Sequence, residues 1–381
     1  MSFKELSLMS DNKGIVLFYP YIPKKSLKIL EKRLSTRWIG QGPMVEKFEK
    51  KFSKLFLKNK KCISTGSGTD ALHLAYILAG IKSGDEVIAP VFTCTATNIP
   101  LLYMGAKIKF ADIDPNTMNI SVKSIAKLIS KKTKAIICVH YGGIPCDMNE
   151  INKIAKKYNV KVIEDAAQAL GASYNGKKIG TISDFTIFSF QAIKHITTGD
   201  GGMLCIKNNR LVEKAKRMRW FGIDRKKKQL GIWENDIKEI GFKYQLTDLG
   251  ASVGYQGLLE FDKVIKHRLK IYNLYLKKLS KNKKIKCIHD FNKKKKNAAW
   301  LFTILTNRKD FLQKKLRDYK IETNQVHFRN DKYSIFKKFV KKSKFPNMNC
   351  LENKYLVLPL HTKVTIKDAN FICDKINQLI N

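Results

Sequence analysis

The chain has 381 residues, 44% of them hydrophobic, and a formal net charge of +41. That length allows one large core and a smaller second domain, and the ordinary Gly and Pro contents exclude disorder on the scale of a domain. The charge comes mostly from lysines spread along the whole sequence, which indicates a lysine-rich composition and argues against a nucleic-acid-binding face.

Neither a membrane segment nor a metal site is expected. No apolar stretch reaches membrane-spanning length, and residues 1–13 lack a signal-peptide pattern. The eight cysteines form no CxxC pair and no His/Cys metal spacing. Cys138 and Cys205 lie in apolar runs that are typical of buried thiols. We therefore expect a soluble, cytoplasmic protein in a reducing compartment.

The N-terminal part is predicted to form an arm followed by two helices. Residues 1–24 are mixed in character and are predicted to be the arm. Apolar residues over 25–60 recur at helical spacing, and a glycine-rich turn at 40–43 divides them into two helices.

From residue 61 onward, predicted strands alternate with predicted helices. The strands are expected at 61–64, 86–89, 107–111, 135–139, 160–164, 185–190 and 203–206. The helices between them are expected at 70–79, 93–103, 121–129 and 148–157. Continuous apolar strands that alternate with helices predict an α/β fold with a mostly parallel sheet, buried on both faces.

The character of the sequence changes after residue 210. A single amphipathic helix is predicted over 258–279, and we place a domain boundary within it. The expected organisation is an arm at 1–24, a large domain at 25–260 and a small domain at 261–381. The two densest lysine runs, 225–228 and 293–296, are predicted to be solvated loops.

The first glycine-rich turn, at residues 66–71, follows a strand and precedes a helix. It fits the dinucleotide pattern GxGxxA, but the acidic residue that should end the next strand is absent, because Asp85 and Glu86 precede that strand. Free amides at a helix N-terminus bind phosphate, so Gly68 and Thr69 are candidate donors. The alternative is a tight turn in which Thr69 caps the helix.

Lys194 and Asp165 form the most informative pair in the sequence. Asp165 ends one apolar run, and Lys194 lies between another such run and a glycine-rich turn. A lysine and a carboxylate delivered by neighbouring strands are what pyridoxal phosphate (PLP) requires, for the Schiff base and for the pyridine nitrogen. Ser189 could donate to a phosphate. The alternatives are a surface lysine and a helix-capping aspartate.

Three segments carry a specific resemblance: TGSGTDALHLA from residue 65, VIEDAAQALGASYNGKKIGTISDFTIFSF from residue 162, and QAIKHITTGDGGML from residue 191. They resemble the DegT–StrS family of PLP-dependent nucleotide-sugar aminotransferases of fold type I. The similarity runs in order from about residue 16 to residue 361. It implies a large domain with a mostly parallel seven-stranded sheet between helices, and a smaller C-terminal α+β domain.

The resemblance also assigns roles to individual residues. It implies that Lys194 binds the cofactor covalently, that Asp165 contacts the pyridine nitrogen, and that Gln168 lies near the phenolic oxygen. Ser189 matches a phosphate-binding hydroxyl, alongside the amides of Gly68 and Thr69.

At two positions the chain departs from the family pattern. Cys94 falls where the family often has an aromatic residue stacked on the cofactor ring. Lys243 takes the place of an asparagine that often reaches the cofactor phosphate of the neighbouring subunit. A lysine could make that contact as a point charge, which implies a homodimer with shared active sites.

The resemblance also bears on the reaction. Some relatives that remove a sugar hydroxyl carry histidine at position 194, so the lysine here favours transamination over dehydration. The turn at 197–202 resembles that of members acting at sugar carbon 4. The implied reaction moves an amino group from glutamate to a nucleotide-diphosphate 4-keto-6-deoxyhexose, giving an amino sugar for glycan or polysaccharide biosynthesis. Candidates for diphosphate contacts, which could equally be packing or surface residues, are Arg219, Arg225, His327 and Arg329.

Four alternatives remain open from the sequence. Two of them keep the cofactor: a PLP-dependent sugar dehydratase and an aminotransferase for 3-keto sugars. A third is a basic nucleic-acid-binding regulator, against which the dispersed charge and the missing recognition motif argue. The fourth is an NAD-dependent sugar enzyme, which lacks support because the ribose-binding acid is absent.

Overall fold

The computed structural model describes residues 14–234, 236–340 and 344–380. The predicted arm, residues 1–24, therefore lies partly outside the described residues. The first described residues, from residue 14, contact the C-terminal part of the chain. Ile15 forms a parallel bridge with Ile321, and the N–H of Leu17 donates to the Glu322 carboxylate at 2.8 Å.

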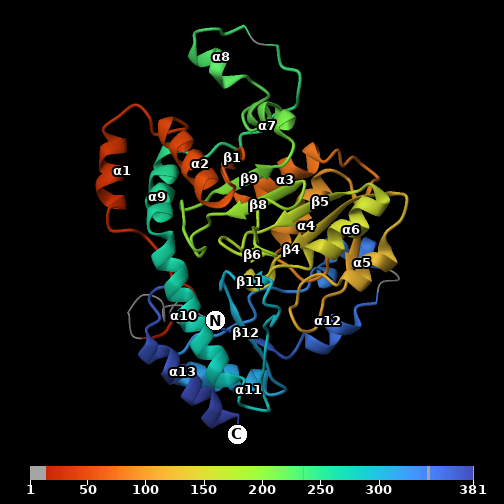
Figure 1. Ribbon diagram of the computed structural model, residues 1–381, viewed down its shortest axis with the longest axis vertical. Coiled ribbons are helices and arrows are strands. Elements are labelled where there is room, and N and C mark those ends of the chain that lie inside the picture. Colours follow the sequence, from red (N-terminus) through yellow and green to blue (C-terminus); the bar gives the residue numbers. More distant parts are fainter. Residues whose placement is uncertain (1–13, 235, 341–343, 381) are drawn as a thin grey trace.

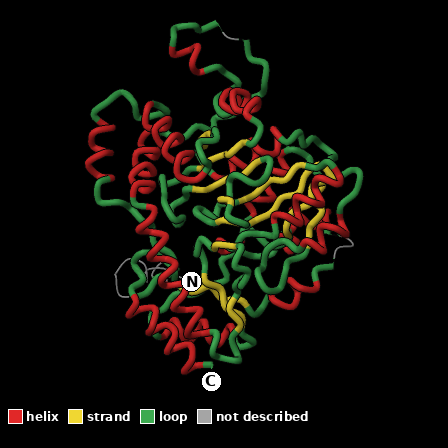
Figure 2. The backbone as a smooth tube through the Cα atoms, viewed as in Figure 1, coloured by secondary structure: helices red, strands yellow, loops and turns green. Residues whose placement is uncertain are grey.

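A seven-stranded sheet lies in the upper part of the molecule (Figures 1 and 2), with the strand order β1-β9-β8-β5-β4-β2-β3. Its strands are β1 (Cys62–Thr65), β2 (Glu86–Pro90), β3 (Lys107–Ala111), β4 (Thr133–Val139), β5 (Lys161–Asp165), β8 (Phe185–Ser189) and β9 (Gly202–Ile206). β9 runs antiparallel to β1 and β8, and the other neighbours are parallel. The predicted α/β fold and mostly parallel sheet are confirmed.

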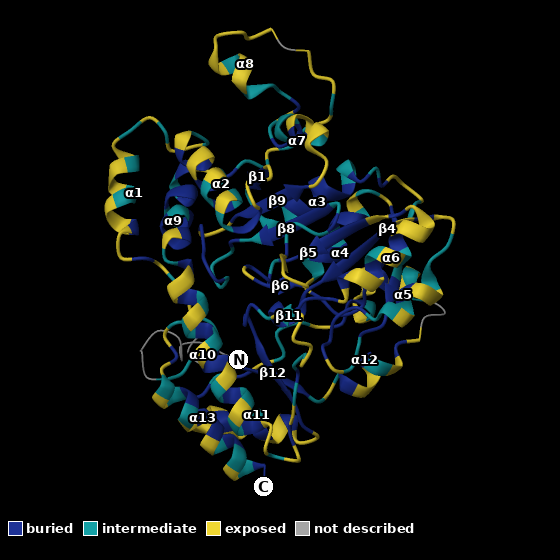
Figure 3. Ribbon diagram, in the orientation of Figure 1, coloured by how far each residue is buried: buried dark blue, intermediate teal, exposed yellow. Residues whose placement is uncertain are grey.

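Helices cover both faces of this sheet, because alternate strand residues point to opposite sides. Ile137 belongs to one hydrophobic core and Ile136 to the other. The first core also contains α3 (Gly68–Leu78), α4 (Thr95–Tyr103) and α7 (Val212–Met218). The second contains α2 (Pro43–Phe56), α5 (Val122–Leu128), α6 (Met148–Tyr158) and α9 (Asp248–Leu259). Figure 3 shows the strands buried between these layers.

The chain enters its C-terminal part, residues 261–381, through a break between two helices. α9 ends at Leu259 and α10 (Phe261–Leu279) begins after Glu260, so the single helix predicted over 258–279 is interrupted there. A third hydrophobic core joins α10 to the elements α11 (Lys309–Asp318), α13 (Ile366–Leu379), β12 (Phe302–Leu305) and β13 (Tyr355–Leu358). The domain boundary at residue 260 stays a prediction.

Later segments also pack near the large sheet without joining it, and three short strands form a separate sheet. β11 (Lys295–Lys296) pairs with β6 (Ser173–Tyr174), which pairs with β7 (Lys177–Lys178). Met348 of α12 (Pro346–Leu351) belongs to the first core. The remaining short elements are α1 (Ser26–Leu34), β10 (Lys286–Cys287) and the 3₁₀ turns η2 (Tyr141–Gly143), η3 (Asn209–Leu211), η4 (Asn330–Lys332) and η5 (Ser334–Phe339).

The segment that carries α8 (Arg225–Gln229) stands out from the body at the top of Figure 1. The lysine run predicted as a loop is therefore helical, because the Asp224 side chain caps it by accepting from the amides of Lys226 and Lys227. Figure 3 shows this segment as mainly exposed. Among the described helices, none combines the length and the apolar character needed to cross a membrane.

Candidate active site

Lys194 lies in a turn that follows the C-terminal end of β8. Its side-chain amine is 3.9 Å from the ring centroid of Trp300, and within the described residues no group forms a hydrogen bond to it. Burial lowers the pKa of Lys194 to about 8, an effect that the charge of Asp165 opposes. A large fraction of this amine is therefore neutral, and hence nucleophilic, near pH 8.

Asp165 ends β5, the strand next to β8, so both residues lie at the carboxyl edge of parallel strands. Asp165 is 4% exposed, and burial raises the pKa of its carboxyl group. One oxygen accepts from the Thr97 hydroxyl at 2.7 Å, and the other accepts from the N–H of Ala167 at 3.1 Å. These donors orient the carboxylate and leave each oxygen a further lone pair for a ligand.

Gln168 connects this site to the C-terminal part of the chain. Its carbonyl oxygen accepts from the N–H of Gly142 at 2.7 Å, and its amide nitrogen lies 2.9 Å from Nε2 of His327. Since the Gln168 amide donates there, Nε2 of His327 carries no proton. Burial, reinforced by the charge of Lys194, lowers the pKa of His327 to about 3, which agrees with a neutral ring.

The segment 66–69 joins β1 to α3 and lies against β8; we call it the anion-binding turn because its free amides suit an anion. The cap of α3 is Ser67, whose hydroxyl accepts from the N–H of Asp70 at 3.0 Å, so Thr69 is not the capping residue. The amides of Gly68 and Thr69 are thus left without a partner among the described residues. A side chain at Gly68 would approach Cβ of Ser189 to 3.0 Å. This glycine keeps the helix N-terminus and the Ser189 hydroxyl close together.

Cys94 and Lys243 occupy different surroundings. Cys94 is exposed at the N-terminus of α4, and its thiol is near enough to Lys194 to affect that amine electrostatically. Lys243 is exposed, with its amine 5.4 Å from the ring centroid of Phe221. The next residue, Tyr244, accepts from the N–H of Gly66 at 2.8 Å, which attaches this segment to the anion-binding turn.

The three candidate arginines differ in their partners. Arg219 donates to Glu49 at 2.7 Å and to Ser64 O at 2.9 Å. Arg329 forms a two-point ion pair with Asp331, with both distances 2.7 Å. The guanidinium of Arg225 donates to the backbone oxygen of Gln41 and lies over the ring of Trp220. Carboxylates therefore already neutralise the first two charges.

The groups without partners at this site fit the chemical groups of PLP. A lysine amine without a hydrogen-bond partner in the described chain, an oriented buried carboxylate and two free helix amides beside a serine hydroxyl occur at one edge of the sheet. They match the aldehyde, the pyridine nitrogen and the phosphate of that cofactor.

The sequence did not reveal three residues that shape this site. Thr97 holds the Asp165 carboxylate, Trp300 lies against the Lys194 amine, and the buried Arg268 acts electrostatically on Lys194. Thr97 belongs to a threonine-rich stretch at a helix start, which is a usable signal. The sequence around Trp300 and Arg268 carries no such signal, because only the tertiary fold brings these residues to Lys194.

Comparisons with known proteins show which family this chain resembles. Residues 20–377 match the DegT/DnrJ/EryC1/StrS aminotransferase family. The chain is 33% identical to a GDP-perosamine synthase of Escherichia coli, covering 96% of this chain and 98% of that protein. It is also 33% identical to a UDP-4-amino-4,6-dideoxy-N-acetyl-beta-L-altrosamine transaminase of Campylobacter jejuni, covering 94% and 96%. A putative sugar aminotransferase of Streptococcus pneumoniae, in its PMP form, superposes with a TM-score of 0.89 at 25% identity, covering 96% and 98%.

Proposed function

This chain belongs to the DegT/DnrJ/EryC1/StrS aminotransferase family, and we propose that it transfers the amino group of glutamate to a nucleotide-linked 4-keto-6-deoxyhexose. It is a PLP-dependent sugar aminotransferase. One observation carries the proposal: a lysine amine with a pKa lowered to about 8 lies at the sheet edge that also holds Asp165 and the anion-binding turn. The name of the Campylobacter relative, with its amino group at carbon 4, supports that position.

The mechanism assigns each residue a separate task. Bound PLP supplies an electron sink for the negative charge that develops at the carbon losing its proton. The amine of Lys194, a large fraction of which is neutral near pH 8, accepts the proton from the α-carbon of glutamate and later returns one to the sugar carbon. The Asp165 carboxylate stabilises a positive charge on the ring nitrogen, and Thr97 keeps that carboxylate in place. The amides of Gly68 and Thr69 bind the phosphate.

The substrate contacts are proposed by the same reasoning. The amide of Gln168 occupies the lone pair of Nε2 of His327, so His327 holds Gln168 in place and offers no acceptor to a substrate at that atom. Arg225 has a guanidinium that no carboxylate in the described chain neutralises, which favours it over Arg219 and Arg329 for the nucleotide diphosphate.

The test of the reaction is a panel of nucleotide keto-sugars with glutamate as the amino donor. We expect amination at carbon 4, identified by the mass and the NMR spectrum of the product. Borohydride should attach the cofactor to the peptide that contains Lys194. Amination at carbon 3, loss of a hydroxyl group, or labelling of another lysine would contradict the proposal.

We also propose a homodimer whose active sites are shared. Three apolar residues of the projecting segment are strongly exposed: Leu230 at 79%, Trp233 at 72% and Ile240 at 83%. Several exposed apolar residues on one projecting segment are typical of a protein interface. Lys243 follows directly on this segment and is itself exposed. A second copy would cover the apolar residues and receive the Lys243 amine at its cofactor phosphate.

Subunit complementation tests the shared sites. Lys194→Ala and Lys243→Ala chains, each weakly active or inactive alone, are mixed, unfolded and refolded together. In a shared-site dimer every hybrid has one intact site, so about one quarter of the wild-type activity should return. Recovery of no activity by a verified hybrid would mean that each site is built from one chain.

The cysteines bear on the compartment. All eight are free thiols, and several of them, such as Cys138 and Cys205, are buried in the second core. Free thiols persist in a reducing environment. We therefore propose that the enzyme acts in the cytoplasm.

A further inference from the structure

The segment 298–300 holds the turn around Lys194 from both sides. The indole N–H of Trp300 donates to Ile193 O at 3.1 Å, and Nε2 of His195 donates to Ala298 O at 2.7 Å. These two contacts bond the residues directly before and after Lys194. The position of the Lys194 backbone therefore depends on a segment more than a hundred residues later in the sequence.

Segment 298–300 is anchored in turn by Arg268 of α10. Nε of Arg268 donates to Ala299 O at 3.0 Å, and Nη2 donates to Trp300 O at 2.8 Å. Arg268 is 3% exposed, and no carboxylate within the described residues pairs with it. A buried charge without a counter-ion is costly, so its retention calls for a reason beyond packing.

The same segment is bonded to the 3₁₀ turn that follows β4. The N–H of Trp300 donates to Gly142 O at 2.9 Å, and the N–H of Gly142 donates to the Gln168 side chain at 2.7 Å. The ring of Trp300 is stacked near Phe18, with centroids 5.8 Å apart, and near His327, with centroids 6.4 Å apart. The indole that lies 3.9 Å from the Lys194 amine is therefore fixed on several sides.

We propose that Arg268 and Trp300 are positioning residues for Lys194. Trp300 sets the position of the amine. Arg268 anchors Trp300 and keeps an unpaired positive charge near the amine. This proposal rests on the proposed role of Lys194 as the lysine that binds the cofactor. It adds to the contact of His327 a second contribution of the C-terminal part to a centre at the edge of the large sheet.

The charge of Arg268 acts on the protonation of Lys194 together with the groups that face the amine. Asp165 at the end of β5 and Cys94 at the start of α4 favour the protonated amine. Arg268 on α10 opposes it, and burial opposes it more strongly. His327 and His195 have pKa values lowered by burial and are neutral, so they add no charge. Removing the Arg268 charge should therefore raise the pKa of Lys194.

The test uses the cofactor-free protein, so its readout does not depend on catalysis. Trace acetic anhydride labels lysines at a series of pH values, and mass spectrometry of the Lys194 peptide gives the midpoint of its reactivity. We expect a wild-type midpoint near the pKa of about 8. Arg268→Met should raise this midpoint, by up to about one pH unit, which is the order of effect of a nearby unit charge at an effective dielectric constant of ~20.

Matched variants separate the charge from its geometry. Lys270→Met removes an exposed positive charge from the same helix, and should leave the midpoint unchanged because solvent screens that charge. Arg268→Lys keeps the charge but loses the two-point anchor, so the midpoint should stay near wild type. In Trp300→Phe the ring remains and the bond to Ile193 is lost. In the loaded enzyme these last two should lower kcat roughly tenfold or more with little change in the KM for glutamate.

Each outcome decides a separate point. An unchanged midpoint in folded Arg268→Met overturns the charge effect, and unchanged kcat in both Arg268→Lys and Trp300→Phe overturns the positioning. If Arg268→Met does not fold, as thermal unfolding will show, the other two variants decide the proposal through kcat. A wild-type protein that aminates no keto-sugar, yet shows the midpoint shift, would refute only the proposed function.

Discussion

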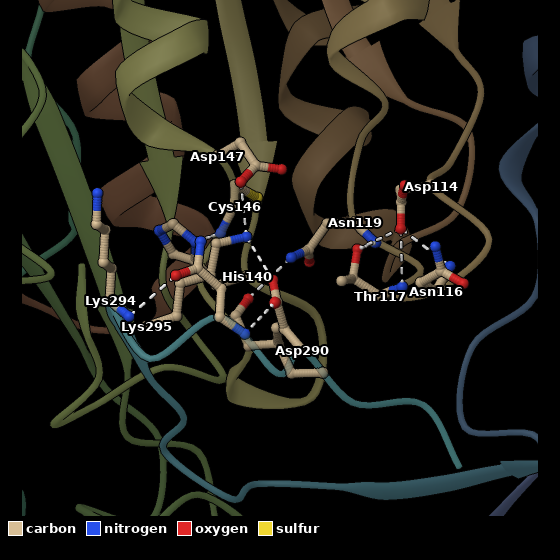
Figure 4. A network of polar contacts seen from close by, with 12 residues as sticks. Asp114, Asn116, Thr117, Asn119, His140, Cys146, Asp147, Asp290, Lys294 and Lys295 are labelled. Atoms are coloured by element: carbon tan, nitrogen blue, oxygen red, sulfur yellow. Dashed lines mark hydrogen bonds and ion pairs between the residues drawn. The ribbon is translucent and has the colours of Figure 1, made fainter. Parts of the chain in front are cut away.

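Lys194 and Lys295 are two lysines withdrawn from solvent whose surroundings have opposite effects. Lys295, in β11, has a side chain that is 3% exposed, and its amine pairs with Asp147 at 2.7 Å and with Asp290 at 2.5 Å (Figure 4). These carboxylates raise the pKa of Lys295 although burial acts against them. At Lys194 the amine lies against a ring, and its pKa falls to about 8. Pairing, more than burial, distinguishes a structural lysine from a reactive one.

The largest expected difference between the two lysines is in turnover. Lys194→Ala removes both the covalent attachment and the proton-transfer group, so amino transfer should fall by about 10⁴-fold or more. The cofactor's visible absorbance should be lost as well. Lys295→Met is the matched control and should keep turnover near wild type, measured with the same donor and keto-sugar. Retained turnover and absorbance in Lys194→Ala would mean that another residue carries the chemistry.

Substitution of the carboxylates beside the two lysines should also affect kcat to different extents. Asp165→Asn keeps an acceptor for Thr97 but removes the charge that stabilises the ring nitrogen, so kcat should fall about 10²–10³-fold, as on losing one electrostatic contact in an active site. Asp147→Asn makes the same substitution beside Lys295 and should leave kcat unchanged. A loss of similar size in both variants would point to general destabilisation instead, which the unfolding temperature would reveal.

The sequence predicts the sheet and the reactive lysine for a shared physical reason. Strands buried on both faces read as continuous apolar runs, and in parallel strands these runs end at one edge, which places Asp165 and Lys194 together. Lys295 was misjudged because its run of four lysines resembles a solvated loop. Its partner Asp290 lies in the same loop region, but its other partner, Asp147, comes from a distant part of the chain. Arg268 and Trp300 were missed likewise, since no sequence spacing relates them to Lys194.

For stability the order of the two lysines should be reversed, with Lys295 contributing more than Lys194. Lys295→Met leaves Asp147 and Asp290 facing each other without their shared cation, and Asp290 is only 18% exposed. Because Asp147 is half exposed and partly solvated, the unfolding free energy should fall by only about 1–2 kcal/mol. Denaturant titration of the cofactor-free protein measures this loss. Lys296→Met, an exposed neighbour in the same strand, is the control and should change stability little.

The smallest effect expected on turnover is its pH dependence, and the pH dependence of stability has opposite signs at the two lysines. Lys194 must be neutral to accept a proton, so kcat should rise about fivefold between pH 7 and pH 8 if its pKa near 8 governs the reaction. In the cofactor-free protein the lowered pKa means that stability increases as the pH rises from about 8 toward the unfolded value of about 10.4.

Lys295 has a raised pKa, so its contribution to stability is complete below about pH 10.4 and is lost only above it. Unfolding measured from pH 8 to pH 10 should therefore lose its upward slope in Lys194→Met and keep it in Lys295→Met. If the slope of stability against pH persists in Lys194→Met, other groups cause it. The pH dependence would then give no evidence that the unpaired Lys194 amine is the reactive one.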